Sequence, residues 1–180
     1  MLKSKHNKGD DILKNFYQKI HKFFSKGIQF KILKFIYKKI PMFMAASYLL
    51  LLGFLAITWD IKIILAVIVP AFIFLSVTVF RKLFNFQRPY EKMDLPPLIS
   101  KDKKGETFPS RHCASAFAIS GAFFYTNIYP GIFYTILALL VALSRIFAGV
   151  HFVRDVLAAA LYSCALSSLY FIIPYFMPLQ

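Results

Sequence analysis

Three short segments of the sequence, residues 81–89, 109–112 and 144–155, hold most of the side chains that could perform chemistry. Five of the cations in them lie at or near the ends of the apolar stretches: Arg81, Lys82, Arg88, Arg111 and Arg145. Arginine binds phosphate through paired N–H groups, and several cations together can neutralise a group with two or more negative charges. We therefore predict that these five residues bind a phosphoryl group.

The same segments contain side chains suited to phosphoryl transfer. His151 and Asp155 are four residues apart, so on a helix they would share a face and the carboxylate would fix the ring tautomer. Such an imidazole can attack phosphorus, and His112 can protonate the leaving oxygen. Ser110 stands at an expected helix start, where backbone N–H groups also bind phosphate. Because guanidinium groups can stabilise the phosphoryl charge, we expect no metal and no cofactor.

The elements that must position these residues are predicted to be membrane-spanning helices. Apolar residues make up 58% of the 180 residues, against about 45–50% in a soluble domain. Four stretches contain no Asp, Glu, Lys or Arg: 41–59, 63–80, 113–144 and 156–180. Each is long enough to cross a hydrocarbon core about 30 Å thick. The predicted fold class is therefore all-α, a polytopic membrane helical bundle.

We expect about five spans, over residues 41–59, 63–80, 113–129, 131–150 and from 156 onward. The turn between the third and fourth spans is predicted at Pro130-Gly131. Each apolar hairpin returns the chain to the same side of the bilayer, so the three chemical segments should converge at one membrane surface. Ionisable residues at the ends of spans are functional candidates by default.

Residues 1–40 are predicted to form a basic amphipathic N-terminal segment, with 11 lysines and two aspartates. Apolar residues three to four apart in 10–40 predict an interfacial helix, with a break at Gly27. Lysines at 31, 34 and 38 argue against a span, at about 2.5–3.5 kcal/mol each near the bilayer centre. Anionic lipid head groups, rather than nucleic acid, are the expected partner. A solvated arm is the alternative.

The three segments resemble the signature of the type 2 phosphatidic acid phosphatase superfamily: Lys-x6-Arg-Pro, then Pro-Ser-Gly-His, then Ser-Arg-x5-His-x3-Asp. The third motif is complete, as Ser144, Arg145, His151 and Asp155. The second motif has Arg111 in place of Gly. In the first motif, Arg81 falls on the Lys position, and Lys82 follows it.

The resemblance implies roles for the matching residues. His151 would accept the phosphoryl group as a phosphohistidine, and Asp155 would orient it. His112 would act as general acid and then as general base. The phosphoryl oxygens would be bound by Arg81, Arg88, Ser110 and Arg145. Arg111 would either add a cation or remove a close backbone approach to phosphate. Residues 41–180 would then form a transmembrane phosphatase domain.

The resemblance also implies a lipid phosphomonoester or pyrophosphate as the substrate. Undecaprenyl pyrophosphate is the first expectation, and phosphatidic acid and phosphatidylglycerophosphate are the competing substrates. Vanadate-dependent haloperoxidases share the constellation, but they are soluble, which five spans contradict. A catalytically silent lipid-binding protein is the alternative from another class.

The sequence gives two conflicting indications of the membrane face on which the site lies. With five spans, the basic N-terminus and the site share one side, and the positive-inside rule places that side in the cytoplasm. The resemblance implies an extracytoplasmic site in a multi-pass protein of the bacterial plasma membrane. A sixth span over residues 23–40 would reconcile the two.

Overall fold

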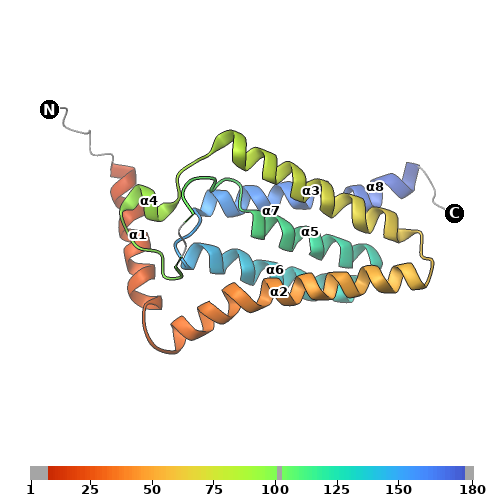
Figure 1. Ribbon diagram of the computed structural model, residues 1–180, viewed down its shortest axis with the longest axis horizontal. Helices are drawn as coiled ribbons and strands as arrows, with labels where there is room; N and C mark the ends of the chain where they lie inside the picture. The colour runs from red at the N-terminus through yellow and green to blue at the C-terminus, as the bar shows by residue number, and fades with distance from the viewer. Residues whose placement is uncertain (1–7, 101–102, 177–180) are drawn as a thin grey trace.

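The computed structural model describes residues 8–100 and 103–176, and all the regular elements in these ranges are helices (Figure 1). In chain order they are α1 (Lys8–Phe24), α2 (Gly27–Ile57), α3 (Lys62–Phe84), α4 (Pro89–Met93), α5 (Arg111–Thr126), α6 (Ile128–Phe147), α7 (Val153–Ser167) and α8 (Leu169–Phe176). The helical fold class predicted from the sequence is confirmed.

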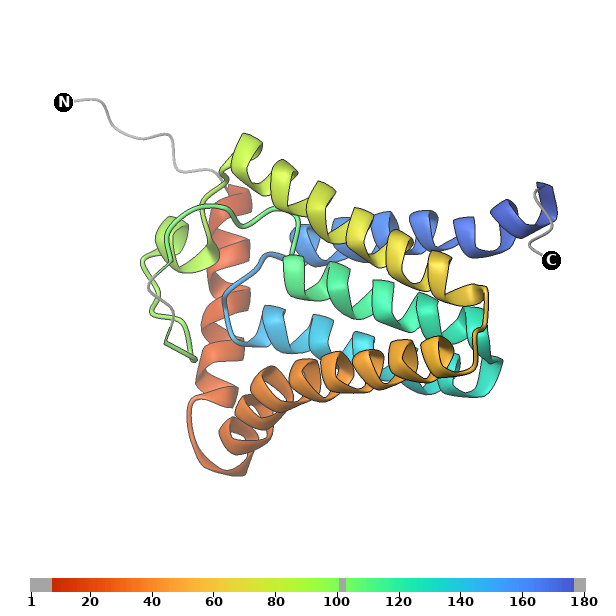
Figure 2. The same ribbon diagram turned by 45° about the vertical axis from the view of Figure 1, so that its right-hand side comes forward.

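The long helices run side by side as a bundle, and α1 lies across one end of it (Figures 1 and 2). Four helical stretches are long and apolar enough to cross a membrane: Gly27–Ile57, Lys62–Met93, Ile128–Phe147 and Val153–Phe176. Helix α5 has 16 residues and lies in the middle of the bundle, in contact with α2, α3, α6, α7 and α8. Five helical paths therefore run along the bundle axis, with α8 continuing α7.

Small residues allow α5 to occupy this central place. Cys113, Ala114, Ala118 and Ala122 are almost completely buried, so neighbouring backbones approach it closely. Helix α6 approaches α5 closely, because its Gly131 lies directly over Phe124 of α5.

Replacing Gly131 by alanine is therefore expected to destabilise the bundle by about 1–3 kcal/mol, as overpacked cores do. A Cβ at this position would lie 2.7 Å from the Cα of Phe124, which is backbone and cannot rotate away. Thermal unfolding in detergent measures the effect. Gly53 is the matched control, because a Cβ there meets nothing within 4 Å. Equal unfolding temperatures for the two variants would contradict this account of the packing.

The first span begins earlier than predicted. Helix α2 starts at Gly27, where the predicted break occurs, and continues through Pro41 without interruption. Residues 28–40 therefore belong to the first spanning helix, and residues 23–40 do not form a separate sixth span. At about 1.5 Å per residue, the 31 residues extend roughly 46 Å, well beyond the hydrocarbon thickness. The lysine-rich first turns can thus lie at head-group depth.

The turn between α5 and α6 is also earlier than the predicted Pro130-Gly131. It falls at Asn127, whose side chain accepts a hydrogen bond from the backbone N–H of Tyr129 at 2.9 Å and so caps α6. Pro130 then lies in the first turn of α6, where its missing N–H costs nothing. A proline read as a turn signal is here a helix-start residue.

Helix α1 has the predicted amphipathic character. Tyr17 is buried against Phe152 and Met93, and Phe24 stacks on Phe147 with ring centroids 5.0 Å apart. The opposite face presents exposed lysines together with exposed Ile12, Phe16 and Phe23. Because Tyr17 and Phe152 are in contact, α1 lies at the end of the bundle where α6 and α7 are joined.

Candidate active site

Helix ends and loops bring most of the predicted site residues to the end of the bundle that carries α1 (Figure 1). Arg81 is in the last turn of α3 and Arg145 in the last turn of α6, while Ser110 and Asp155 open α5 and α7. Six predicted site residues are buried: Arg81, Arg88, Ser110, Arg145, His151 and Asp155. An apolar interior accepts so many ionisable groups only where they contact one another, backbone carbonyls or a ligand.

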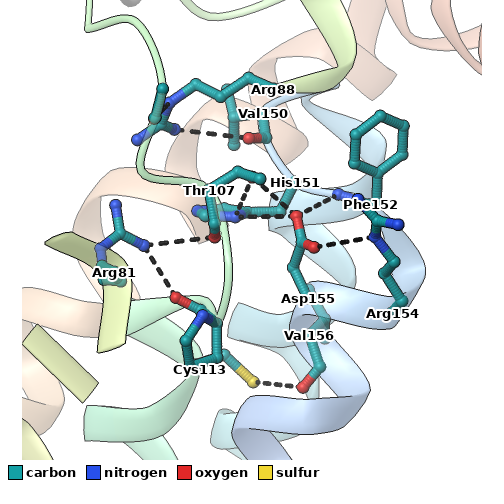
Figure 3. A network of polar contacts seen from close by, with 12 residues as sticks. Arg81, Arg88, Thr107, Cys113, Val150, His151, Phe152, Arg154, Asp155 and Val156 are labelled. Atoms are coloured by element: carbon teal, nitrogen blue, oxygen red, sulfur yellow. Dashed lines mark hydrogen bonds and ion pairs between the residues drawn. The ribbon is translucent and has the colours of Figure 1, made fainter. Parts of the chain in front are cut away.

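Two of the arginines bind backbone carbonyls of the loops around His151 (Figure 3). Arg81 donates from Nη1 to the carbonyl of Pro109 at 2.8 Å and to that of Thr107 at 3.3 Å. Arg88 donates from Nε to the carbonyl of Gly105 at 2.9 Å and from Nη1 to that of Val150 at 3.4 Å. Arg81 thus ties the 103–110 loop to the end of α3, and Arg88 joins that loop to the one that carries His151.

His151 and Asp155 are adjacent, but not in the way predicted. His151 lies in the loop before α7 rather than on the helix, and its Nδ1 is 3.6 Å from Asp155 Oδ2, too far for a good hydrogen bond. Thr107 bridges them: its hydroxyl lies 3.1 Å from His151 Nδ1 and donates to Asp155 Oδ2 at 2.6 Å (Figure 3). With Nδ1 protonated, the chain runs from imidazole to hydroxyl to carboxylate, and Nε2 keeps its lone pair.

Asp155 also fixes the start of α7. Its Oδ2 accepts the backbone N–H of Phe152 at 3.0 Å, which closes the first turn of the helix around the loop. On the other side of the loop, the hydroxyl of Tyr17 in α1 donates to the backbone carbonyl of His151 at 3.0 Å. The His151 backbone and ring are therefore held from two directions.

Burial lowers the pKa of His151 from its ordinary value of 6.5 to about 4. The interaction with Asp155 opposes this effect of burial, and the positive charges of Arg88 and Arg81 add to it. The imidazole is therefore neutral at pH 7, as a nucleophile must be.

Acid should therefore destabilise the folded protein. Below pH 6.5 the imidazole of the unfolded chain binds a proton, whereas the folded one stays neutral down to about pH 4. Folding stability linked to His151 is then complete above pH 6.5 and is lost as the pH falls to about 4, by up to about 3 kcal/mol. Thermal unfolding across this range should show a smaller acid loss in His151→Gln than in the wild type. Equal acid losses in both would contradict a neutral buried imidazole.

Two predicted phosphate-binding side chains have buried polar atoms that no described group satisfies: Ser110 Oγ and Arg145 Nε. Ser110 is the N-cap residue of α5, yet its hydroxyl makes no capping bond. Buried donors without acceptors cost free energy, which a bound phosphoryl oxygen would recover. Asp155 Oδ1 is also without a hydrogen bond, with Arg154 Nε 3.5 Å away.

The remaining three predicted residues are less buried. His112 and Arg111, in the first turn of α5, line a cavity of about 340 Å³ together with residues of α2 and α3. Lys82 is exposed in the last turn of α3, beside buried Arg81. Arg81 and Lys82 therefore differ in burial, and it is Arg81 that binds the Thr107 carbonyl beside His151. Among the described residues, no group of three His, Cys, Asp or Glu side chains could hold a metal ion.

The sequence did not single out Thr107, Tyr17 or Tyr37, all of which contact site residues. Thr107 is 44 residues from His151, and Tyr37 is 108 residues from Arg145, whose Nη2 donates to the Tyr37 carbonyl at 3.0 Å. In the sequence, the only indication that Thr107 lies near the site is that it comes two residues before Pro109-Ser110. Contacts over such separations leave no spacing pattern in the chain.

A bundle of membrane-spanning length with a buried imidazole, a carboxylate and arginines at one end defines a multi-pass membrane enzyme of the phosphoryl-transfer type. The chain belongs to the PAP2 superfamily, whose profile matches residues 59–177 and so includes all three motifs. It is accordingly a phosphatase, a hydrolase of phosphoric esters, acting on lipid phosphates, as predicted. Helix α1 and all of α2 lie outside the matched residues.

The solved structures that share the fold include the following two. One is LpxE from Aquifex aeolicus, which is 22% identical with a TM-score of 0.59, covering 81% of this chain and 96% of that chain. The other is the first transmembrane PAP2-type phosphatidylglycerolphosphate phosphatase from Bacillus subtilis. It is 20% identical with a TM-score of 0.62, covering 97% of this chain and 90% of that chain. Comparison with curated proteins gives no match.

Proposed function

We propose that the protein hydrolyses undecaprenyl pyrophosphate or a similar polyprenyl pyrophosphate through a phosphohistidine, without a metal. Phosphatidic acid and phosphatidylglycerophosphate are the alternative substrates; the Bacillus subtilis structure is named for the latter. One observation carries the proposal: a neutral, buried His151 held by Thr107 and Asp155, with the buried donors Ser110 Oγ and Arg145 Nε left unsatisfied nearby.

The first step forms the covalent intermediate. His151 Nε2 attacks phosphorus with its lone pair, the bond from phosphorus to the leaving oxygen breaks, and protonated His112 gives that oxygen its proton. The ring becomes cationic, and Asp155 stabilises it through the Thr107 hydroxyl. Arginine and Ser110 donors neutralise the charge on the phosphoryl oxygens.

The second step releases phosphate. His112, now neutral, takes a proton from water, whose oxygen attacks phosphorus as the phosphorus–nitrogen bond breaks. Inorganic phosphate leaves, and both histidines return to their starting states. No proton or electron is left over, so the cycle needs no further reactant.

The apolar surroundings of His112 support a lipid substrate. The cavity beside His112 and Arg111 adjoins a second one of about 370 Å³, and the two share lining residues such as Ala45 and Phe74. The second cavity is lined mainly by apolar residues of α2, α3 and α5, at the depth of the membrane-spanning helices. A head group at His112 would thus have space for its chain.

The proposal is tested by phosphate release from the purified, detergent-solubilised protein. Undecaprenyl pyrophosphate, phosphatidic acid and phosphatidylglycerophosphate are compared side by side, with EDTA present. We expect release that survives EDTA, with the polyprenyl pyrophosphate fastest. Faster release from either glycerolipid would replace the substrate proposal, and loss of release in EDTA would overturn the metal-free mechanism.

We further propose that α1 rests on anionic lipid head groups of a bacterial plasma membrane. Its exposed lysines and aromatics, together with its place across the bundle end, fit a membrane surface. Cysteines introduced at Lys14 in α1 and at Lys103 in the site loop, in a Cys164→Ser background, are expected to react with an impermeant reagent from the same face. Labelling from opposite faces would contradict the five-span arrangement, and the face that reacts identifies the compartment of the site.

A further inference from the structure

The prolines inside α2 and α3 each leave one backbone carbonyl without its helical donor, since proline has no N–H. Pro41 in α2 frees the carbonyl of Tyr37, and Pro70 in α3 frees that of Ala66. In a membrane such carbonyls need another donor. The Tyr48 hydroxyl donates to Ala66 at 2.7 Å, which ties α2 to α3. The donor to Tyr37 is the Nη2 of Arg145, at 3.0 Å.

Arg145 is held on α2 by a second contact as well. Its guanidinium carbon lies 3.8 Å from the centroid of the Tyr37 ring, within cation–π distance. The side chain is 1% exposed, so the two Tyr37 contacts replace water for much of the charged group. Its Nε–H remains buried without an acceptor. The guanidinium is thus fixed on one side and has an unused donor.

We infer that Tyr37 and Pro41 are positioning residues for Arg145. The proline-freed carbonyl and the tyrosine ring fix the guanidinium, so that its unused N–H donor is available to a phosphoryl oxygen. The inference rests on the proposed phosphate-binding role of Arg145. It extends the active site to α2, which lies outside the residues matched by the superfamily.

The inference explains why a proline in the middle of a 31-residue helix is useful here. An alanine at position 41 would restore an N–H that competes with Arg145 for the Tyr37 carbonyl. The helix would gain a backbone hydrogen bond, while the guanidinium would lose an acceptor. Phosphate binding and helix stability are therefore expected to change in opposite directions.

The test compares Pro41→Ala with Pro70→Ala, the matched change at the proline whose freed carbonyl accepts from Tyr48 and not from Arg145. The lipid that the wild type hydrolyses fastest is the substrate, and orthovanadate, a mimic of pentacoordinate phosphorus, is the inhibitor. For Pro41→Ala we expect kcat/KM to fall by about 10- to 100-fold and vanadate to bind correspondingly more weakly, with no loss of thermal stability. Pro70 lines the apolar cavity proposed for the lipid chain, so this control is compared by vanadate, which has no chain. Pro70→Ala should leave the vanadate inhibition constant within about twofold of the wild type.

Two further variants separate positioning from a general effect on structure. Tyr37→Leu removes the ring and should weaken vanadate inhibition, whereas Tyr37→Phe keeps the ring and the carbonyl and should restore most of it. In an Arg145→Ala background, Pro41→Ala should have almost no additional effect on kcat/KM, because the group it positions is gone.

Equal vanadate inhibition in Pro41→Ala and the wild type, or full additivity with Arg145→Ala, would overturn the inference. Failure of the proposed function gives a different result: the wild-type protein itself would release no phosphate.

Discussion

Replacing His151 by glutamine is expected to lower kcat for phosphate release by about 10⁴-fold or more. Glutamine occupies a similar volume, but it has no ring nitrogen with a lone pair that can bond to phosphorus. Burial keeps the His151 imidazole neutral, which leaves Nε2 the lone pair that the proposed attack requires. The measurement is phosphate release under saturating substrate.

A labelling experiment shows whether the loss is that of a nucleophile. Substrate labelled in the terminal phosphate should transfer label to the wild-type protein, in a bond that acid breaks and base does not, as expected for a phosphoramidate. His151→Gln should take up no label. Label on the His151→Gln protein, or activity near that of the wild type, would refute the phosphohistidine mechanism. His21, on α1, is a control histidine for substitution to glutamine, with unchanged activity expected.

Replacing Thr107 by valine is expected to lower kcat by about 10²-fold while changing KM little. Valine keeps the shape of threonine but removes the hydroxyl that joins His151 Nδ1 to Asp155 Oδ2. Without it, 3.6 Å separates the imidazole from the carboxylate that we propose stabilises its cationic form. Steady-state kinetics with the fastest lipid measure the effect, and Thr107→Ser should restore most of the activity because serine keeps the hydroxyl.

A double-mutant cycle with Asp155→Asn distinguishes a bridge from a packing role. Asp155→Asn alone should cost about 10³- to 10⁴-fold in kcat, as loss of the orienting carboxylate does in histidine-dependent hydrolases. In that background, Thr107→Val should cost less than about threefold, because the hydroxyl no longer has a carboxylate to reach. Additive losses, or a Thr107→Ser variant as slow as Thr107→Val, would mean that Thr107 serves only the shape of the loop.

The sequence predicted the helices well where apolar periodicity and charge agree, and less well where they conflict. The break at Gly27 and the start of α5 after Ser110 lie where predicted. The helix of the first span begins at Gly27 and not at Pro41, the start predicted because the lysines of 28–40 suggest a separate surface helix. In the structure they lie on the outer turns of a helix longer than the membrane core is thick. Charge alone does not separate an interfacial helix from the protruding end of a spanning one.

For the candidate site too, the sequence predicted some features and missed others. Motif spacing predicted that His151 and Asp155 would be neighbours, and they are, although a loop and not a helix face joins them. The spacing could not predict Thr107, because its contacts with them depend on how the 103–110 loop folds over the ends of α3 and α5. Local patterns thus identified residues with reactive groups but not those that orient them.

The contacts of Tyr17 in α1 and Tyr37 in α2 with the site determine which part of the chain the site needs. Tyr17 holds the backbone of His151, and Tyr37 holds the side chain of Arg145. A shortened chain beginning at residue 59 would retain every superfamily motif. It would nevertheless lack both supports, so its motifs would be present without being organised. The stretch that the superfamily profile matches is therefore not an autonomous unit here. Any graft of the candidate site onto another scaffold must replace the contacts of Tyr17 and Tyr37, which lie outside that stretch.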